Sequence, residues 1–344
     1  MLIPIENIYY LLCYVWNKLE EKDRVSITID DKTDILDLLA KVLVSGTKIL
    51  LKRGIEKNYL TISQEIAGVK GKLELSETVK RGILKKQRTF CTMDEFSSNI
   101  LSNQLLVSTF YRLINTQDLD PSLKGELKRL IWMFSGIQPI EIQNSHFRQV
   151  RLHRNNKFYG FLLNVCQLIY ENSLPTEKPG EWRFIDFMRD EQKMNKLFET
   201  FLLNFYRKHL IGWQVSSPAI TWQLIPEDEK AIEHLPRMLT DITLERQDEK
   251  IIIDAKYYRQ TMTENFERQK IHSGNLYQIF SYLINQRGGD EKTRKTRGIL
   301  LYPTIDEEYD LHYMFEEHPI QIKTVNLNQH WRGIEKRLVG VVGK

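Results

Sequence analysis

Two aspartates and a lysine in the C-terminal half lie at a spacing that could bring them together. Asp254 and Lys256 follow a run of three isoleucines, Ile251–Ile253, and Asp241 interrupts an earlier apolar run. Side chains alternate along a strand, so Asp254 and Lys256 point to the same side. Mg²⁺ prefers oxygen ligands and is commonly held by one or two carboxylates together with substrate phosphate. We therefore expect Asp241 and Asp254 to bind Mg²⁺ for phosphodiester hydrolysis. Lys256, with its pKa lowered by burial, would orient or deprotonate the attacking water.

The tripeptide Asp-x-Lys is not specific by itself, because the same pattern recurs in polar stretches where solvated charges are the natural interpretation. The other occurrences are Asp30–Lys32, Asp228–Lys230, Asp248–Lys250 and Asp290–Lys292. Only Asp254–Lys256 ends a buried strand and has an aspartate on an upstream strand. From the pattern alone, a metal site and a plain salt bridge at a strand end both remain open.

Three further polar residues could belong to the same site. Glu199 lies on an amphipathic helix before the two strands, where it could approach the metal or remain a solvated helix residue. Gln278 and Tyr282 are one helical turn apart in a later helix, and they could contact DNA or Lys256. The alternative for this pair is an ordinary polar helix edge.

The elements that position these residues form an α/β sandwich around a mixed sheet. The runs Arg237–Leu244 and Lys250–Ala255 are separated by the polar segment Glu245–Glu249, which predicts a hairpin that brings Asp241 close to Asp254. Helical periodicity precedes the hairpin, and more strands and helices follow it. The expected elements are a helix over residues 194–205, a helix over 275–285, a strand over 298–302 stopped by Pro303, strands over 311–315 and 320–325, and a helix from about 329.

The N-terminal half predicts helices at both ends of a β-rich segment. The first helix carries apolar residues from Ile8 to Leu19 at helical spacing, with Asn7 as a possible cap, and Asp34 lies at the start of the second helix. Alternating runs separated by glycines then predict strands, and two more helices follow. The strands are expected at 59–62, 71–75 and 89–92, and the helices at 98–115 and 121–134.

The β-rich segment is basic. Between Gly68 and Met93 it contains seven basic residues and two acidic ones. Such a projection could bind nucleic acid or an acidic protein surface, and the composition alone does not separate these partners.

Length and composition predict two domains in a protein that stays in the cytoplasm. The chain has 344 residues and a formal net charge of +4. We expect a boundary between residues 1–157 and 158–344, although Pro175–Gly180 is the better-defined break. Three widely spaced cysteines indicate reduced thiols, and the sequence shows neither a signal peptide nor an apolar run long enough to cross a membrane.

Several motifs together resemble a known family. The segments around Asp241 and Asp254–Lys256 resemble the core of PD-(D/E)xK nucleases. More closely, the chain resembles the McrC family, the nuclease subunits of McrBC restriction endonucleases that act on DNA containing 5-methylcytosine. The segments that carry this resemblance are Leu235–Thr243, Asp254–Tyr258, Asn275–Gln278, Asn7–Leu12, Gly68–Lys72 with Glu74, and Thr78–Gly82.

The resemblance implies an α+β N-terminal domain with a projecting β-rich finger, followed by a PD-(D/E)xK nuclease domain. Asp241 and Asp254 would be Mg²⁺ ligands and Lys256 the catalytic lysine, with Thr240 in the place of the family's proline. The finger would enter the hexameric ring of an McrB-like AAA+ GTPase and stimulate GTP hydrolysis. Lys80 and Arg81 would make contacts near the pore. The ring would read modified cytosine and translocate DNA, and this chain would cut when two complexes meet.

Two other functions are compatible with the sequence. The chain could be a stand-alone repair nuclease of the same fold, or a catalytically idle adaptor that activates an AAA+ ring. Hydrolysis of GTP by the chain itself is not expected, because the Gly68–Lys72 segment is too short for a phosphate-binding loop.

Overall fold

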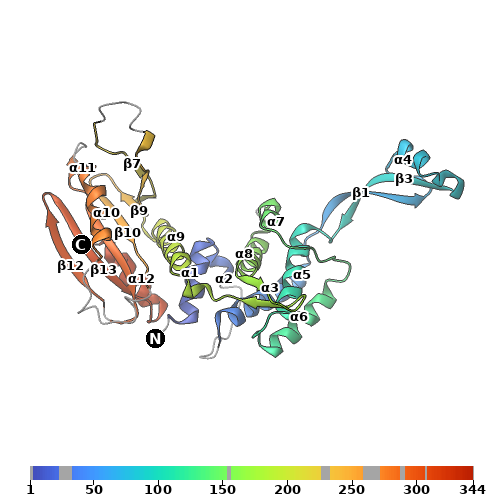
Figure 1. Ribbon diagram of the computed structural model, residues 1–344, viewed down its shortest axis with the longest axis horizontal. Coiled ribbons are helices and arrows are strands. Elements are labelled where there is room, and N and C mark those ends of the chain that lie inside the picture. Colours follow the sequence, from blue (N-terminus) through green and yellow to red (C-terminus); the bar gives the residue numbers. More distant parts are fainter. Residues whose placement is uncertain are drawn as a thin grey trace. The chain divides into compact units, whose positions relative to one another are not determined.

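The computed structural model describes residues 3–22, 33–152, 156–225, 233–258, 272–286, 291–306 and 308–343. The chain forms two compact units (Figure 1). The first, here called the sheet unit, combines Met1–Lys22 with Asp186–Lys344. The second, here called the hairpin unit, is the continuous segment Asp23–Ile185.

A six-stranded mixed sheet forms the centre of the sheet unit, which confirms the expected mixed sheet. Strands β10, β11 and β13 are parallel to one another, whereas β6, β9 and β12 run antiparallel to their neighbours. In spatial order the strands are β12 (Asp310–Phe315), β13 (His318–Asn326), β11 (Arg297–Thr304), β10 (Lys250–Ala255), β9 (Ile242–Glu245) and β6 (Gln214–Ser216). Strand β11 continues through Pro303, which pairs with Val325 instead of ending the strand.

The central strands β10, β11 and β13 are buried along almost their whole length, so helices pack on the sheet. Helix α10 (Ser273–Ile284) packs Ile279 and Leu283 against Ile252 and Leu300. A Cβ on Gly298 would lie 2.8 Å from Ile279, so glycine permits this close approach of α10 to β11. Besides α1, described below, the other helices and short elements of the described part of this unit are α2 (Leu19–Lys22), η3 (Phe187–Arg189), α9 (Glu191–His209), β7 (Ala219–Ile220), β8 (Met238–Leu239), α11 (Glu291–Arg294) and α12 (Trp331–Val342).

The first helix, α1 (Ile5–Val15), belongs to the sheet unit, where it packs on α9. Pro4 occupies the N-cap position, so the expectation that Asn7 caps this helix was wrong. Asn7 is buried, and its Nδ2 donates to the carbonyl oxygens of Leu327 (2.8 Å) and Gln329 (2.9 Å). The side chain thus ties α1 to the segment that follows β13.

The hairpin unit contains a helical bundle in which α8 packs on α3 and α5. Gly46 permits close packing of α3 on α8, because a Cβ there would lie 2.5 Å from Leu162. These contacts keep α8 in the hairpin unit, so the division observed at Ile185 differs from the boundary expected after residue 157. The helices are α3 (Ile35–Arg53), α5 (Leu101–Ile114), α6 (Pro121–Met133), α7 (Asn144–Gln149) and α8 (Lys157–Glu171).

The break expected at Pro175–Gly180 forms a turn within the hairpin unit. Strands β4 (Ser173–Pro175) and β5 (Trp182–Phe184) pair on either side of it, and the Thr176 N–H donates to the Glu181 carbonyl at 3.0 Å. Proline and glycine here mark a tight reversal of the chain and not a domain boundary.

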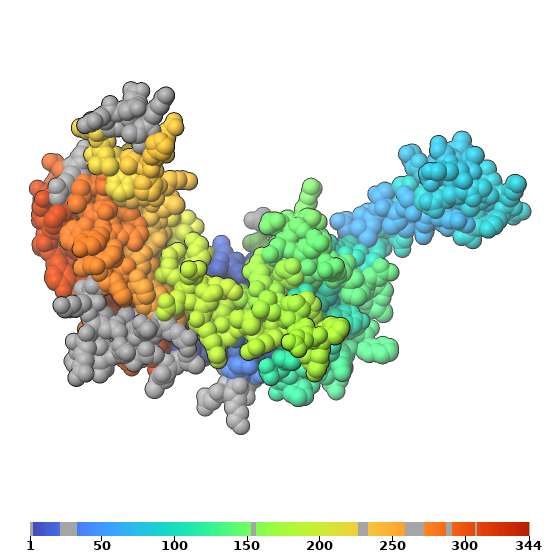
Figure 2. Space-filling model, viewed as in Figure 1, coloured from blue at the N-terminus to red at the C-terminus, as the bar shows by residue number. Residues whose placement is uncertain are grey.

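A long antiparallel hairpin extends from the helices of this unit. Strands β1 (Asn58–Ala67) and β3 (Arg88–Ser97) pair along their whole length, and Figure 1 shows them running from the helices to α4. The tip between the strands contains β2 (Lys72–Leu73), α4 (Leu75–Lys80) and η1 (Ile83–Lys86). We call residues 58–97 the finger; Figure 2 shows it as a narrow arm of the hairpin unit.

The described helices include none with the length and apolar composition needed to cross a membrane. All three cysteines are buried and free of disulfides, as expected.

Candidate functional site

The hairpin of β9 and β10 brings the three predicted residues together. Ile253 pairs with Ile242, so continuing the antiparallel register places Asp254 opposite Asp241. The Ala255 N–H donates to Asp241 Oδ2 at 2.9 Å. Lys256 Nζ lies 2.9 Å from Asp254 Oδ2 and 3.9 Å from Asp241 Oδ2. The side chains therefore form one cluster at the end of a buried strand.

This cluster carries more negative than positive charge. Asp254 is 0% exposed, and among the described residues its Oδ1 meets no hydrogen-bond donor. Burial raises the pKa of Asp241 to about 6, and Asp254 adds to this while Lys256 opposes it. Burial likewise raises the pKa of Asp254, against the effect of Lys256. Two buried carboxylates with one ammonium and an unbonded oxygen fit a divalent cation, which would remove the excess charge.

The expectation that burial lowers the pKa of Lys256 was wrong. Burial does act in that direction, but the neighbouring carboxylates Asp254, Asp241 and Glu199 act in the other and raise the pKa overall. The Lys256 side chain is 14% exposed, so its charge is held inside the cluster. This favours a lysine that donates hydrogen bonds as a cation over one that removes a proton as a base.

Thr240 explains how the chain turns into β9. Strand β8 pairs with β7, and β9 begins only at Ile242, so the predicted continuous strand over 237–244 is two strands. At the break, the Thr240 N–H and hydroxyl both donate to the Pro218 carbonyl at 3.1 Å. A proline at this position could not make the N–H bond.

Helix α9 adds Glu199 to the edge of the cluster. Its side chain is 19% exposed, and burial together with Asp241 raises its pKa. Glu199 in turn raises the pKa of Asp254, so the carboxylates interact. Among the residues described, however, no group of three acidic, histidine or cysteine side chains is arranged to hold a metal. Glu199 therefore lies next to the aspartate pair, and the pair itself has the ligand number that Mg²⁺ usually takes from protein.

Asn195 is a functional candidate that the sequence did not reveal. Its Oδ1 accepts a hydrogen bond from the Tyr257 N–H at 2.9 Å, and its Nδ2 donates to Glu199 Oε1. The available signal was its one-turn spacing from Glu199, but a single asparagine on an amphipathic helix is otherwise unremarkable in sequence.

Tyr282 and Gln278 are bonded to each other and to the chain that leads to Asp241. Tyr282 is 2% exposed, and its hydroxyl donates to the Leu239 carbonyl at 2.7 Å. Gln278 Nε2 donates to that same hydroxyl at 2.6 Å. The buried position prevents contact of Tyr282 with DNA, and it instead supports the strand that leads to Asp241.

The two tyrosines after Lys256 are packing residues. Tyr257 is 5% exposed. The Tyr258 hydroxyl donates to Asn275 Oδ1, and Asn275 Nδ2 donates to the Tyr302 hydroxyl, both at 3.0 Å. Asn275, the first residue of a motif that carried the resemblance, therefore links α10 to β11.

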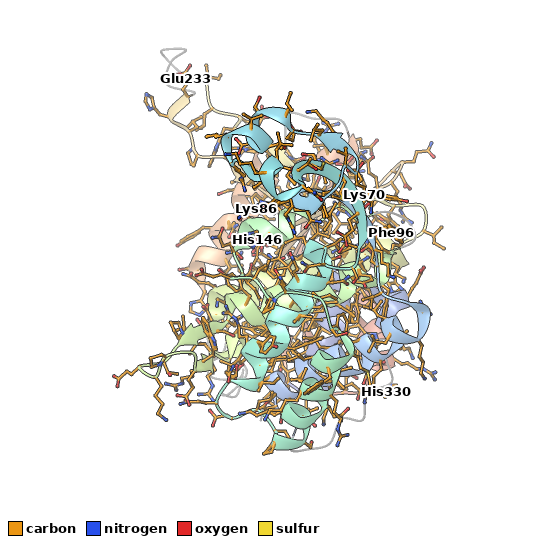
Figure 3. The ribbon with its side chains drawn as sticks, turned by 90° about the vertical axis from the view of Figure 1, so that its right-hand side faces the viewer. Lys70, Lys86, Phe96, His146, Glu233 and His330 are labelled. Atoms are coloured by element: carbon orange, nitrogen blue, oxygen red, sulfur yellow. The ribbon has the colours of Figure 1, made fainter. Side chains whose placement is uncertain are left out.

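The finger places its basic residues at the tip. Lys80 and Arg81 both lie close to Glu77, and the Arg81 guanidinium also lies 4.2 Å from the centroid of the Phe90 ring. By contrast, the described residues supply no ion-pair partner for Lys70, Lys85 or Lys86. Figure 3 shows Lys70 and Lys86 at the tip. The tip also exposes apolar side chains, namely Val69, Leu75, Val79 and Leu84.

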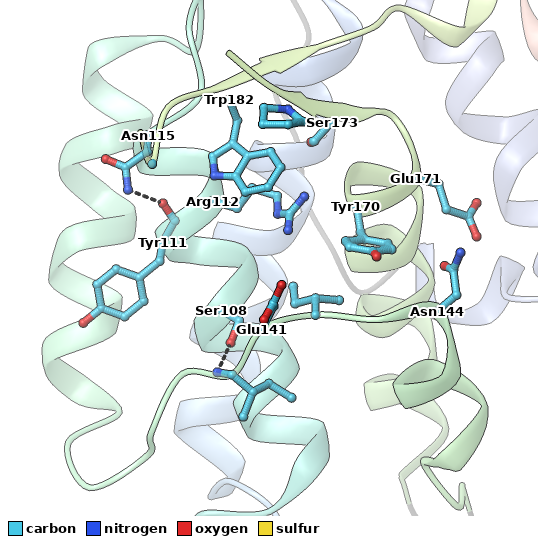
Figure 4. A pocket seen from close by; sticks show the side chains of 14 residues that line it. Ser108, Tyr111, Arg112, Asn115, Glu141, Asn144, Tyr170, Glu171, Ser173 and Trp182 are labelled. Atoms are coloured by element: carbon cyan, nitrogen blue, oxygen red, sulfur yellow. Dashed lines mark hydrogen bonds between the residues drawn. The ribbon is translucent and has the colours of Figure 1, made fainter. Parts of the chain in front are cut away.

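The hairpin unit also contains a pocket of about 690 Å³ that none of the predicted residues lines (Figure 4). The Arg112 guanidinium lies between the rings of Trp182 (3.7 Å) and Tyr170 (4.9 Å). The Trp182 N–H donates to the Asn115 carbonyl, so these contacts fasten β5 to the end of α5.

Comparisons with known proteins agree with the resemblance. The family described as "McrBC 5-methylcytosine restriction system component" matches residues 6–303. The "Type IV methyl-directed restriction enzyme EcoKMcrBC" of Escherichia coli (strain K12) is 32% identical over 98% of this chain and 97% of its own length. A half-complex of the Thermococcus gammatolerans McrB AAA+ hexamers with bound McrC matches with a TM-score of 0.54. That match has 14% sequence identity and covers 95% of this chain and 76% of the other, and at this identity it shows a shared fold and no more.

Proposed function

The chain belongs to the family of McrBC 5-methylcytosine restriction system components, and from this premise we propose that it is the DNA-cutting subunit of a GTP-dependent restriction complex. The observation that carries the proposal is the cluster of Asp241, Asp254 and Lys256 at the end of β10. The sheet around the cluster would be the PD-(D/E)xK nuclease domain.

Each residue of the cluster has a role in hydrolysis of a DNA phosphodiester. Asp241 and Asp254 would hold Mg²⁺, which when bound lowers the pKa of a water molecule and neutralises charge developing on the phosphate. Lys256 donates hydrogen bonds from its ammonium, and it orients the attacking water or the scissile phosphate. Tyr282 and Gln278 support the chain leading to Asp241, and Glu199 adds negative charge beside the pair.

The finger would bind an McrB-like AAA+ GTPase ring and stimulate its GTP hydrolysis. The related solved complex contains McrB AAA+ hexamers with bound McrC, which supports a partner of this kind. The exposed lysines and apolar side chains at the tip of the finger suit an acidic protein surface with apolar contacts better than a bare phosphate backbone. Lys80 and Arg81 remain proposed contacts, and Lys85 and Lys86 join them because no ion pair with a described residue engages their charges. The ring would select DNA that contains modified cytosine.

The test is cleavage of methylated plasmid by this chain with its GTPase partner, GTP and Mg²⁺, in wild type and in Asp254→Ala. We expect the variant to lose cleavage by at least about 10³-fold, since it removes a metal ligand, and to keep full GTPase stimulation. Unchanged cleavage would refute the nuclease assignment. Stimulation without cleavage in the wild type would favour the idle adaptor, and cleavage by the chain without its partner would favour the stand-alone nuclease.

A further inference from the structure

One side chain, that of Asn195, connects helix α9 with the end of β10 and with Glu199. Strand β10 pairs with β11 as far as Ala255, and the Lys256 N–H donates to the Leu301 carbonyl at 3.0 Å. The next N–H, that of Tyr257, lies beyond the ladder and finds its acceptor in Asn195 Oδ1 at 2.9 Å. Asn195 therefore fixes the peptide immediately after Lys256.

The amide nitrogen of Asn195 makes the second connection, to Glu199 Oε1. Glu199 lies near two buried aspartates, and like charges would push its carboxylate away. Two donors hold it: Asn195 Nδ2 on one oxygen, and Lys196 Nζ, 3.5 Å from Oε2, on the other. The lysine is 79% exposed and screened by solvent, whereas Asn195 is half-buried, so the asparagine defines the position.

We infer that Asn195 is a positioning residue of the cleavage site, which sets both the lysine and the third carboxylate relative to the aspartate pair. This rests on the proposed nuclease function. A single amide suits the task because its oxygen accepts from the backbone while its nitrogen donates to a carboxylate. Substitutions of residues that orient the groups around a metal commonly reduce metal affinity or activity 10- to 100-fold.

The test compares Asn195→Ala with Asn204→Ala in the full chain. Asn204 is a matched control, because it is an asparagine on the same helix whose side chain is likewise bonded to distant backbone: its Nδ2 donates to the carbonyls of Tyr14 (3.0 Å) and Val15 (3.4 Å). We expect Asn195→Ala to exchange the Tyr257 amide hydrogen faster and to bind Mg²⁺ roughly 10-fold or more weakly by calorimetry. Cleavage by the complex should show a reduced kcat with an unchanged KM for DNA. Asn204→Ala should leave all these quantities as in wild type.

Asn195→Asp separates the two bonds. The new carboxylate still accepts from the Tyr257 N–H, so the Tyr257 amide hydrogen should exchange slowly again. The same carboxylate repels that of Glu199, so cleavage should stay as low as in Asn195→Ala. Wild-type cleavage in Asn195→Asp would overturn the role assigned to the Glu199 bond, and equal behaviour of Asn195→Ala and Asn204→Ala would overturn the inference as a whole. Asp254→Ala distinguishes failure of this inference from failure of the proposed function. Cleavage by Asp254→Ala would refute the nuclease function itself, whatever the Asn195 variants do.

Discussion

At the scale of single residues, the cluster around Asp254 shows what a sequence can and cannot reveal. An aspartate and a lysine at the end of an isoleucine run can be recognised, because alternation fixes their common side and the run fixes their burial. The pKa of Lys256 could not be predicted, since the direction of its shift depends on three carboxylates, one on strand β10, one just before β9 and one on helix α9. Asn195 was missed for a similar reason, because the backbone N–H that its side chain accepts from, that of Tyr257, is 62 residues away in sequence.

The pKa of Asp241, raised from 3.8 to about 6, predicts how pH and Mg²⁺ act together. Ionising this carboxyl is harder in the fold than in the unfolded chain. The metal-free protein therefore loses stability as the pH rises from about 4 to about 6. Under the proposed function Mg²⁺ would bind the ionised pair and offset this loss, so the Tm increase on adding Mg²⁺ should be larger at about pH 7.5 than at about pH 5. Thermal melts of the wild type and of Asp254→Asn measure this. The variant should show little Mg²⁺ effect, and an equal increase at both pH values in the wild type would contradict the prediction.

Thr240 allows a second prediction at this scale. Thr240→Pro restores the residue that the related nuclease motif carries, yet it removes both hydrogen bonds to the Pro218 carbonyl. We expect it to lower the free energy of unfolding by about 1–3 kcal/mol, because the half-buried Pro218 carbonyl loses both donors. Thr240→Val, which keeps the N–H, is the control and should lose less in chemical denaturation. A proline variant as stable as the wild type would show that these bonds contribute little.

At the scale of elements, helix α9 places an exposed lysine, Lys196, beside the site in addition to Glu199. Lys196 lies close enough to lower the pKa of Asp241, and it is 79% exposed, whereas Lys256 is enclosed. Lys196 is therefore the exposed cation beside the site, and we expect it to contact a DNA phosphate next to the scissile one. Lys208 lies at the other end of the same helix, about 18 Å away along its axis.

Lys196→Ala should therefore weaken DNA binding and reduce the slope of log affinity against log salt by about 1, because one phosphate contact is lost. The measurement is made in the Asp254→Ala background, where DNA is not cut. Lys208→Ala should leave the slope unchanged. Equal effects of the two substitutions would show that only the net charge of the chain matters.

The finger was predicted as a β-rich segment, but α4 and η1 were not, because short helices lack a full period of apolar residues. Its register now permits a clean removal of the tip. Ala67 pairs with Arg88, so replacing residues 68–87 with Asn-Gly would close β1 and β3 with a two-residue turn. We expect this variant to lose at least about 10-fold in GTPase stimulation and to keep the Mg²⁺-induced rise in Tm. Full stimulation would mean that the tip does not contact the partner.

At the scale of the whole molecule, the division of the chain was the least predictable feature. The periodicity of α1 shows that one face is buried, but it does not say that the face packs on α9, almost two hundred residues later. Tyr14 carries much of this contact. Its ring lies 5.4 Å from that of Phe201, and its hydroxyl is 2.7 Å from His209 Nε2.

Tyr14→Ala should therefore destabilise the sheet unit by about 3–5 kcal/mol, the usual loss for a large buried aromatic. Because the hairpin unit lacks this residue, denaturation followed by hydrogen exchange should show faster opening in Asp186–Lys344 and unchanged protection in Asp23–Ile185. Tyr10→Ala, which removes a ring stacked on Trp331 at the edge of the same helix, should cost less. Uniform loss of protection in both units would show that they unfold together.

The split sheet unit also sets the order in which a growing chain can complete its parts. Domains generally fold as units during translation, while the ribosome adds roughly 5–20 residues per second. The hairpin unit is contiguous and ends at Ile185, so all of its residues have been made while β9, β10, β11 and β13 are still to be synthesised. Helix α1 emerges before α9 and cannot pack on it until the ribosome has passed residue 209. The part proposed to engage the GTPase is thus finished before the part proposed to cut DNA, and a ribosome stalled at mid-chain releases no nuclease.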